Sequence, residues 1–383
     1  MKAKRKALTA KSGLQHTPRM AASAPRPSRL AASLGRPIAR APQPRVAAAD
    51  PAALAAAAYE LLSSREVSLS VDLGRDLVLA TPLVAASGPY GYGAEVADLV
   101  DFDRLGALVT RGTTLKPRAG HPGPRLAEVP GGLLVGIGLQ NPGLDAVLER
   151  YGAAWAGWPL PVIVNLCAET AGELGEAVRR LEGAPGVAGI EINLSCGTGR
   201  GGAIPGLDPD STSSWIAAAR RATDLPVIAK LTASAADIWA IAQAAEDAGA
   251  DVIAAINTLP AFLPARDGRG PALGSGYGGL CGPALKSIAL RAVWEIAQSV
   301  DIPIIGIGGV TVLDDVLDML AAGASAVGVG VAAMADPMLP VRLGDELADA
   351  CRARGVASVR DLVGTALPKK RSAPSTRGAE YAR

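Results

Sequence analysis

GIEIN, residues 189–193, is the stretch that decides the fold, because it alternates apolar and polar residues within a short β-run. Ile190, Ile192 and the following Leu194 share one side of the strand, while Glu191 and Asn193 share the other. In a closed parallel barrel the apolar side faces the surrounding helices and the other side faces the interior. The stretch therefore predicts a barrel strand with a polar inner face.

Seven further β-runs lie on either side of this stretch. They are LVAAS at 83, ALVTR at 107, VIVNL at 162, VIAKL at 227, VIAAIN at 252, IIGIG at 304 and AVGVG at 326. Between them, residues 235–248 and 286–300 show apolar residues at helical spacing. Eight strands alternating with helices predict an α/β fold, a (β/α)8 TIM barrel. Residues 115–130 and 261–282 are insertions after strands, which places them on the face where barrels bind ligands.

The basic residues are concentrated at the two ends of the chain. Residues 1–49 contain eleven Lys or Arg and no acid, and residues 369–383 contain five against one Glu, which leaves −13 for the rest of a chain whose total is +2. We expect a basic disordered tail plus a short helix over 1–64, the barrel over 65–368 and a disordered tail over 369–383. The first tail also has the composition of an organelle transit peptide, which remains the alternative.

Several functional classes are disfavoured by composition. An acidic body does not suit nucleic-acid binding, and the longest apolar run, residues 321–335, is too short to span a membrane. Only two histidines, His16 and His121, are present, so we expect no metal site and no His-based triad. The four cysteines contain no CxxC pair, which favours a reducing, cytoplasmic location.

Polar residues stand at the ends of five predicted strands, where strand alternation points them inward: Arg111, Asn165, Asn193, Lys230 and Asn257. Burying them at one mouth is costly unless a ligand accepts their hydrogen bonds. A flat polar ligand such as a flavin ring would do so. An internal network, for instance between Lys230 and Glu191, is the alternative, and the two are compatible. Glu191 lies deeper, so we assign it to structure.

The last two strands end in glycines: Gly306, Gly308, Gly309, Gly328 and Gly330. Barrels often bind phosphate at this place, so the pattern indicates a phosphorylated cofactor.

The glycine-rich segment 196–209 directly follows GIEIN and begins with Cys196. A thiol placed over the mouth can act as a base when its surroundings favour the thiolate. Most single cysteines are inert, and we expect that of Cys167, Cys281 and Cys351.

Seven segments resemble the class 1 dihydroorotate dehydrogenases, most closely subclass B, the type of catalytic subunit that pairs with an iron–sulphur and FAD subunit. They are AASGPYGYG from 85, LVTRGTTLKPR from 108, GIGLQNPG from 136, EINLSC from 191, INTL from 256, GGLCGPALKSIAL from 278 and DIPIIGIGG from 301. The resemblance runs in order from residue 71 to residue 340.

The resemblance implies an FMN cofactor at the C-terminal face of the barrel. Its contacts would be Ser87, Arg111, Gly112, Asn165, Asn193, Lys230, Ile256, Gly282, Gly308, Gly309, Gly330 and Val331. The charge of Lys230 would stabilise the reduced ring. Cys196 would be the catalytic base that removes a proton from one carbon while the neighbouring carbon gives up a hydride. Substrate contacts would come from Arg111, Val135, Gly136, Asn193, Thr198, Asn257 and Thr258.

The sequence departs from the family pattern at four places. Val135 and Thr198 stand where the family has substrate-binding Asn residues, Arg111 replaces a Lys, and Val331 replaces a Thr of the phosphate loop. The phosphate change is mild because backbone N–H groups do most of that binding. Two lost amides forfeit about 1 to 3 kcal/mol per unpaired partner group. These losses favour a substrate other than dihydroorotate.

The leading expectation is therefore an FMN-dependent oxidoreductase that interconverts CH–CH and C=C next to a carbonyl or carboxylate. One alternative is a genuine dihydroorotate dehydrogenase of pyrimidine biosynthesis, and another is a flavin-binding protein without turnover. The expected partners are a small carboxylate or cyclic amide substrate, a second copy of the chain in a homodimer and, as a candidate, the iron–sulphur/FAD electron-transfer subunit.

Overall fold

Eight parallel strands close into a barrel. The computed structural model describes residues 66–196 and 203–368, so the predicted helix and tails of residues 1–64 and 369–383 lie outside the described residues. The barrel strands follow the order β10-β13-β14-β3-β4-β7-β8-β9. Their bounds are Leu83–Ala85 (β3), Ala107–Val109 (β4), Val162–Leu166 (β7), Val187–Asn193 (β8), Val227–Leu231 (β9), Val252–Ala255 (β10), Ile304–Ile307 (β13) and Ala326–Val329 (β14). All eight predicted β-runs form these strands, which confirms the TIM barrel.

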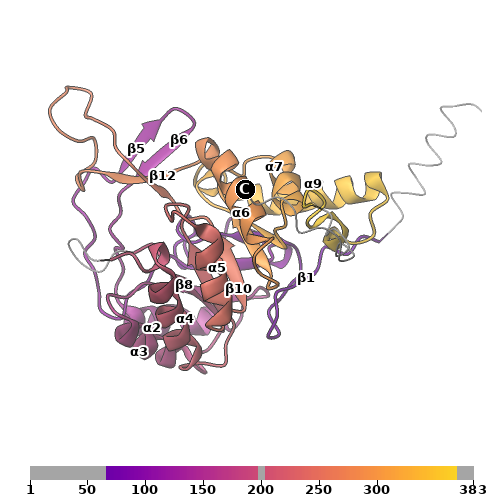
Figure 1. The fold of residues 1–383 in the computed structure, drawn as a ribbon, viewed down its shortest axis with the longest axis horizontal. Helices are drawn as coiled ribbons and strands as arrows, with labels where there is room; N and C mark the ends of the chain where they lie inside the picture. Colours follow the sequence, from indigo (N-terminus) through magenta and orange to yellow (C-terminus); the bar gives the residue numbers. More distant parts are fainter. Residues whose placement is uncertain (1–65, 197–202, 369–383) are drawn as a thin grey trace, which may run out of the picture. The chain divides into compact units, whose positions relative to one another are not determined.

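Helices follow seven of the strands and pack outside them (Figure 1). They are α2 (Leu144–Trp155), α3 (Ala171–Leu181), α4 (Pro209–Arg220), α5 (Ile238–Asp247), α6 (Lys286–Ile296), α7 (Leu313–Ala321), α8 (Ala332–Ala335) and α9 (Leu339–Arg354). Side-chain oxygens of Thr170, Asp208 and Asp237 cap α3, α4 and α5 by accepting backbone N–H groups of the first turn. The β3–β4 connection contains only a short 3-10 helix, Phe102–Arg104.

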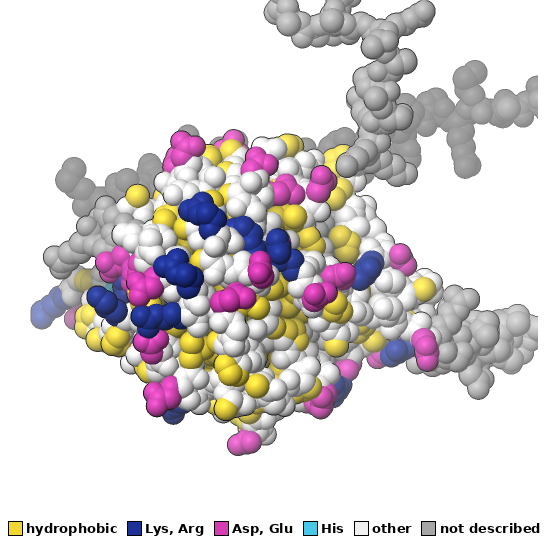
Figure 2. Space-filling view, turned by 90° about the horizontal axis from the view of Figure 1, so that it is seen from below, with side chains coloured by type: hydrophobic (Ala, Val, Ile, Leu, Met, Phe, Trp, Pro, Cys, Tyr) yellow, Lys and Arg dark blue, Asp and Glu magenta, His cyan; other side chains and the backbone are white. Residues whose placement is uncertain are grey.

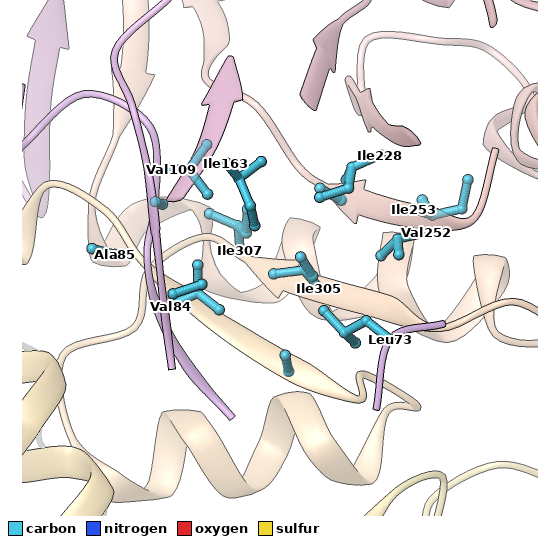
Figure 3. Packing of buried hydrophobic residues seen from close by; sticks show 14 of the residues in the cluster. Leu73, Val84, Ala85, Val109, Ile163, Ile228, Val252, Ile253, Ile305 and Ile307 are labelled. Atoms are coloured by element: carbon cyan, nitrogen blue, oxygen red, sulfur yellow. The ribbon is translucent and has the colours of Figure 1, made fainter. Parts of the chain in front are cut away.

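The barrel interior is apolar below its polar mouth. Ile163 and Ile228 lie two residues before Asn165 and Lys230 and share their inner side, and Val252 pairs in register with Ile228; all three are fully buried. Figure 3 shows Ile163, Ile228 and Ile305 directed into the space between the strands. A hairpin of β1 (Val71–Asp72) and β2 (Val78–Leu79) adds the fully buried Leu73 to the same core. This close-packed base fixes the strands whose ends carry the polar residues.

A second sheet is formed by the two insertions and the segments beside them. Its antiparallel strands run in the order β11-β12-β6-β5, with bounds Leu259–Ala261 (β11), Gly278–Cys281 (β12), Gly132–Val135 (β6) and Leu126–Val129 (β5). Figure 1 shows β5, β6 and β12 together, outside the barrel strands. The segments follow β4 and β10, so they lie on the predicted face of the barrel.

Charges of both signs are mixed on the surface. On the face shown in Figure 2, acidic and basic side chains are interspersed with apolar ones. Within residues 66–196 and 203–368, no helix is long and apolar enough to cross a membrane.

Candidate functional site

Polar side chains at the ends of β7, β8 and β9 contact one another inside the barrel mouth. The Nδ2 of Asn165 donates to Oε1 of Glu191 at 2.5 Å, and Nζ of Lys230 lies 3.7 Å from the same oxygen. The Nδ2 of Asn257, which follows β10, donates to Oδ1 of Asn193 at 3.2 Å. The contacts of Asn165 and Lys230 with Glu191 confirm the inward direction predicted from strand alternation. They also show that the Lys230–Glu191 network, named above as the alternative to a ligand site, exists.

Two buried polar atoms of this region have no hydrogen-bond partner among the described residues. They are Oε2 of Glu191, a residue that is 1% exposed, and Oγ of Ser195. Buried polar atoms are nearly always paired with protein, water or a ligand. Glu191 lies below the mouth, as expected for a structural residue. Its Oε1 contacts Asn165 and Lys230, whereas its Oε2 has no partner among the described residues.

A cavity of about 270 Å³ lies next to this network. Its lining includes many of the residues predicted to contact cofactor or substrate, namely Arg111, Val135, Lys230, Ile256, Asn257, Thr258, Gly282, Gly308, Gly309, Gly330 and Val331. Others do not line it, namely Ser87, Gly112, Gly136, Asn165, Asn193 and Cys196. Thr198 lies outside the described residues. The structure therefore brings most of the predicted set to one cavity.

Three of the predicted glycines shape one end of this cavity. Gly308 and Gly309 have φ angles of +137° and +78°, which residues other than glycine rarely adopt. A Cβ at Gly309 would lie 2.8 Å from the backbone N of Lys286, whereas a Cβ at Gly330 would meet no atom within 4 Å. The backbone at Gly330 thus borders open space, and a phosphorylated ligand could approach its peptide groups closely.

Several apolar residues of the lining were not predicted. It includes Leu126 and Ile137 near the second sheet, Leu285 before α6, and Met334 in α8. Cys281, expected to be inert, also lines the cavity. The insertions were recognised as lying on this face, but their pairing into a sheet was not, because a short apolar run does not reveal its strand partner. Ligand cavities are usually apolar with a few polar groups, as here.

Cys196 contacts Cys167, a residue that was expected to be inert. The two Sγ atoms are 3.2 Å apart, and Sγ of Cys167 also donates to Oδ1 of Asn165 at 3.7 Å. Cys167 directly follows β7 and is 1% exposed, while Cys196 is partly exposed. No local pattern in the sequence indicated this contact, since the residues are 29 positions apart and follow different strands.

The pair separates the acidities of its two thiols. The hydrogen bond between the two thiols and the nearby charge of Arg118 lower the pKa of Cys196, against an opposing effect of burial. The pKa of Cys167 is raised by the hydrogen bond with Cys196 and by burial. Arg118 itself lies 2.5 Å from a carboxylate oxygen of Glu169. Cys196 is therefore the thiol that ionises first, as a base at this position requires.

In the part of the chain that the structure describes, no group of three or more His, Cys, Asp or Glu side chains is placed to hold a metal ion. The groups that the described residues bring to the site are the Cys196 thiol, the buried amine of Lys230, the guanidinium of Arg111 and the amides at the strand ends.

Comparisons with known proteins agree with this geometry. A family model described as "Dihydroorotate dehydrogenase" matches residues 73–350. The chain is 44% identical over 289 residues to "Dihydroorotate dehydrogenase B (NAD(+)), catalytic subunit" of Pelobacter propionicus, covering 75% of this chain and 95% of that protein. It is 43% identical over 297 residues to the protein of the same name from Geobacter sulfurreducens, covering 77% and 97%.

A solved structure supports the fold. It is the crystal structure of DHODH from Eimeria tenella in complex with ferulenol, with a TM-score of 0.66 and 22% sequence identity, covering 83% of this chain and 96% of that one. At this identity the likeness concerns the fold alone. The names of the sequence relatives do not support the expected substrate other than dihydroorotate, and they favour the alternative of pyrimidine biosynthesis.

Proposed function

Because the chain belongs to the dihydroorotate dehydrogenase family, we propose that it oxidises dihydroorotate to orotate, as in pyrimidine biosynthesis. Family membership makes it an FMN-dependent dehydrogenase acting on a CH–CH bond. The observation that carries the proposal is one cavity lined by Arg111, Lys230, Asn257 and Thr258, in a chain that covers 95% of a relative bearing this name.

The described residues fit FMN. We assign its flavin ring to the polar mouth. The buried Lys230 and the partly exposed Arg111 supply positive charge there, and Oε2 of Glu191 and Oγ of Ser195 are buried polar atoms without a partner among the described residues. The remaining ring contacts would come from Ser87, Gly112, Asn165, Asn193, Ile256 and Gly282. The phosphate would lie against the backbone of Gly308, Gly309, Gly330 and Val331, where the open space at Gly330 admits it. When bound, FMN supplies the acceptor for the substrate's hydride.

The substrate's carboxylate would bind Arg111, whose planar guanidinium can donate two parallel hydrogen bonds. Asn193, Asn257, Thr258 and the backbone of Gly136 are assigned to its ring edges, together with Thr198 from outside the described residues. Val135 leaves one edge unpaired, at a cost of about 1 to 3 kcal/mol. A hydrogen bond to a charged group contributes about 1.5 to 3 kcal/mol, so an additional bond from Arg111 can offset that loss. Val135 therefore does not exclude dihydroorotate.

Cys196 is the proposed base that takes a proton from the substrate carbon. Its lowered pKa supports this role, because a larger fraction of the thiol is then ionised near neutral pH. The uncharged, wholly buried Cys167 thiol stabilises that thiolate without competing for the substrate's proton.

The relatives are named as catalytic subunits of an NAD(+) enzyme. We propose that this chain likewise passes its electrons to a separate iron–sulphur/FAD subunit, and that it forms a homodimer with a second copy.

The test is turnover of the FMN-loaded protein with dihydroorotate and an artificial electron acceptor, with orotate measured by chromatography. We expect orotate at rates of at least about 1 per second, within the usual range for enzymes. Turnover of a less polar acid but not of dihydroorotate would show that the substrate is not dihydroorotate. Bound flavin with no turnover of any candidate would indicate a flavin-binding protein.

A further inference from the structure

The contact between Cys167 and Cys196 places a second thiol against the proposed catalytic base. We propose that hydrogen peroxide converts this pair into a reversible disulfide that switches off proton removal. The loss of activity rests on the proposed function, whereas formation of the disulfide rests only on the two thiols.

The geometry requires little movement. The Sγ atoms are 3.2 Å apart, and a disulfide needs about 2.05 Å, so a closure of about 1 Å suffices. Cys167 is held in place, since its backbone N–H donates to the carbonyl of Thr113. Cys196 lies beyond the end of β8, outside any strand or helix, so no ladder hydrogen bond opposes its displacement. Cys196 is thus the residue that moves.

Accessibility and charge set the order of reaction. Cys196 is partly exposed, while Cys167 is 1% exposed, so a small oxidant from solvent meets Cys196 first. The positive charge of Arg118 favours the Cys196 thiolate, and the thiolate is the form that attacks a peroxide. Cys167 is then the resolving thiol, adjacent to the oxidised sulfur and shielded from the oxidant itself.

The two steps balance. The Cys196 thiolate attacks one peroxide oxygen, the O–O bond breaks, and the sulfur is oxidised by two electrons to a sulfenic acid while hydroxide leaves and is protonated to water. The Cys167 sulfur then attacks the Cys196 sulfur, the S–S bond forms and the S–O bond breaks. The departing hydroxide takes the Cys167 proton and leaves as water. Two thiols and one peroxide therefore give one disulfide and two waters.

Cys167 also protects the base from irreversible damage. A sulfenic acid without a neighbouring thiol can react with a second peroxide to give a sulfinic acid, which ordinary thiol reductants do not restore. Capture by Cys167 ends the sequence at a disulfide, which such reductants do reverse.

The test treats the FMN-loaded protein with hydrogen peroxide and then with dithiothreitol, following intact mass, peptide linkage under non-reducing conditions and flavin reduction by dihydroorotate. We expect a species two hydrogens lighter, a linked pair of peptides containing Cys167 and Cys196, and a loss of about 10²-fold in the flavin reduction rate that dithiothreitol reverses. A Cys167→Ser variant should form no linkage and should instead gain oxygen irreversibly at Cys196.

Cys281→Ala is the matched control, because it removes another partly exposed thiol but leaves the pair intact. It should still form the linkage. The proposal is overturned if the wild-type protein gains oxygen without linkage, or if Cys167→Ser loses mass as the wild type does. Linkage that forms in a protein unable to oxidise dihydroorotate would refute the proposed function and leave the disulfide standing.

Discussion

Replacing Cys167 with Ala should shift the pH dependence of catalysis. The variant removes the thiol that lies 3.2 Å from Cys196 and lowers the pKa of that base. A hydrogen bond to a charged group contributes about 1.5 to 3 kcal/mol, and a thiol is a weak donor, so we take the lower end. That value corresponds to about a 10-fold change in the ionisation equilibrium. The pKa of Cys196 should therefore rise in the variant.

The sign follows from the form that reacts. A base must be unprotonated, so kcat/KM rises with pH and levels off above the pKa of Cys196. Raising that pKa moves the acidic limb to higher pH. At a pH below both values the variant should be about 10-fold slower, and at a pH above both it should match the wild type.

The assay measures kcat/KM for dihydroorotate across pH with the FMN-loaded proteins. Cys167→Ser keeps a hydroxyl donor and should return most of the limb toward its original position. An acidic limb that stays at the wild-type pH in Cys167→Ala, or a uniform loss of rate at every pH, would show that Cys167 does not set the pKa of Cys196.

Three further outcomes are expected. Val135→Asn restores an amide to the cavity wall and should raise kcat/KM for dihydroorotate by about 10-fold in steady-state assays, since one unpaired edge costs about 1 to 3 kcal/mol; a decrease would show that Arg111 already satisfies the substrate. The buried Asp315 accepts hydrogen bonds from Thr311 and forms an ion pair with Lys286. Burial raises the pKa of Asp315, but these contacts outweigh burial and lower it. Asp315→Asn should reduce the free energy of unfolding in urea at neutral pH by about 1 to 3 kcal/mol, and the difference should shrink as pH falls through the lowered pKa; a constant difference would contradict it. Deleting residues 1–49 should leave the melting temperature and flavin content unchanged, because so polar a segment buries little surface; loss of folded protein would contradict this.

The barrel could be predicted from the sequence because each strand carries a local pattern. Alternation in GIEIN placed Glu191 and Asn193 on the inner side, and the same reasoning applied to Asn165 and Lys230. A strand's two faces are fixed by its period of two, so a few residues suffice to assign them. The glycines after β13 and β14 could also be recognised from the sequence, because glycine marks positions where the backbone can adopt a positive φ, as Gly308 does.

Contacts between distant segments could not be predicted in this way. The pairing of β6 with β12 joins residues far apart in sequence, and nothing in either run specifies the other. The contact of Cys167 with Cys196 depends on how the chain turns after two neighbouring strands. Such turns are set by packing rather than by a local period.

The expected change of substrate gave too much weight to losses. Val135 removes an amide, and the sequence shows this directly. Arg111 was itself predicted to contact the substrate, and it lines the same cavity as Val135. The expectation gave the two lost amides more weight than this gain and so favoured a different substrate, whereas the relatives favour dihydroorotate.

A single turnover without oxygen tests most directly whether dihydroorotate reduces the flavin with Cys196 as the base. The FMN-loaded protein is mixed rapidly with dihydroorotate under anaerobic conditions, and flavin absorbance is followed in the wild type and in Cys196→Ala. We expect the flavin absorbance of the wild type to bleach promptly. In the variant the rate of flavin reduction should be lower by about 10²-fold, with the flavin still bound. An absorbance that dihydroorotate leaves unchanged in the wild type, or equal rates in the two proteins, would contradict it.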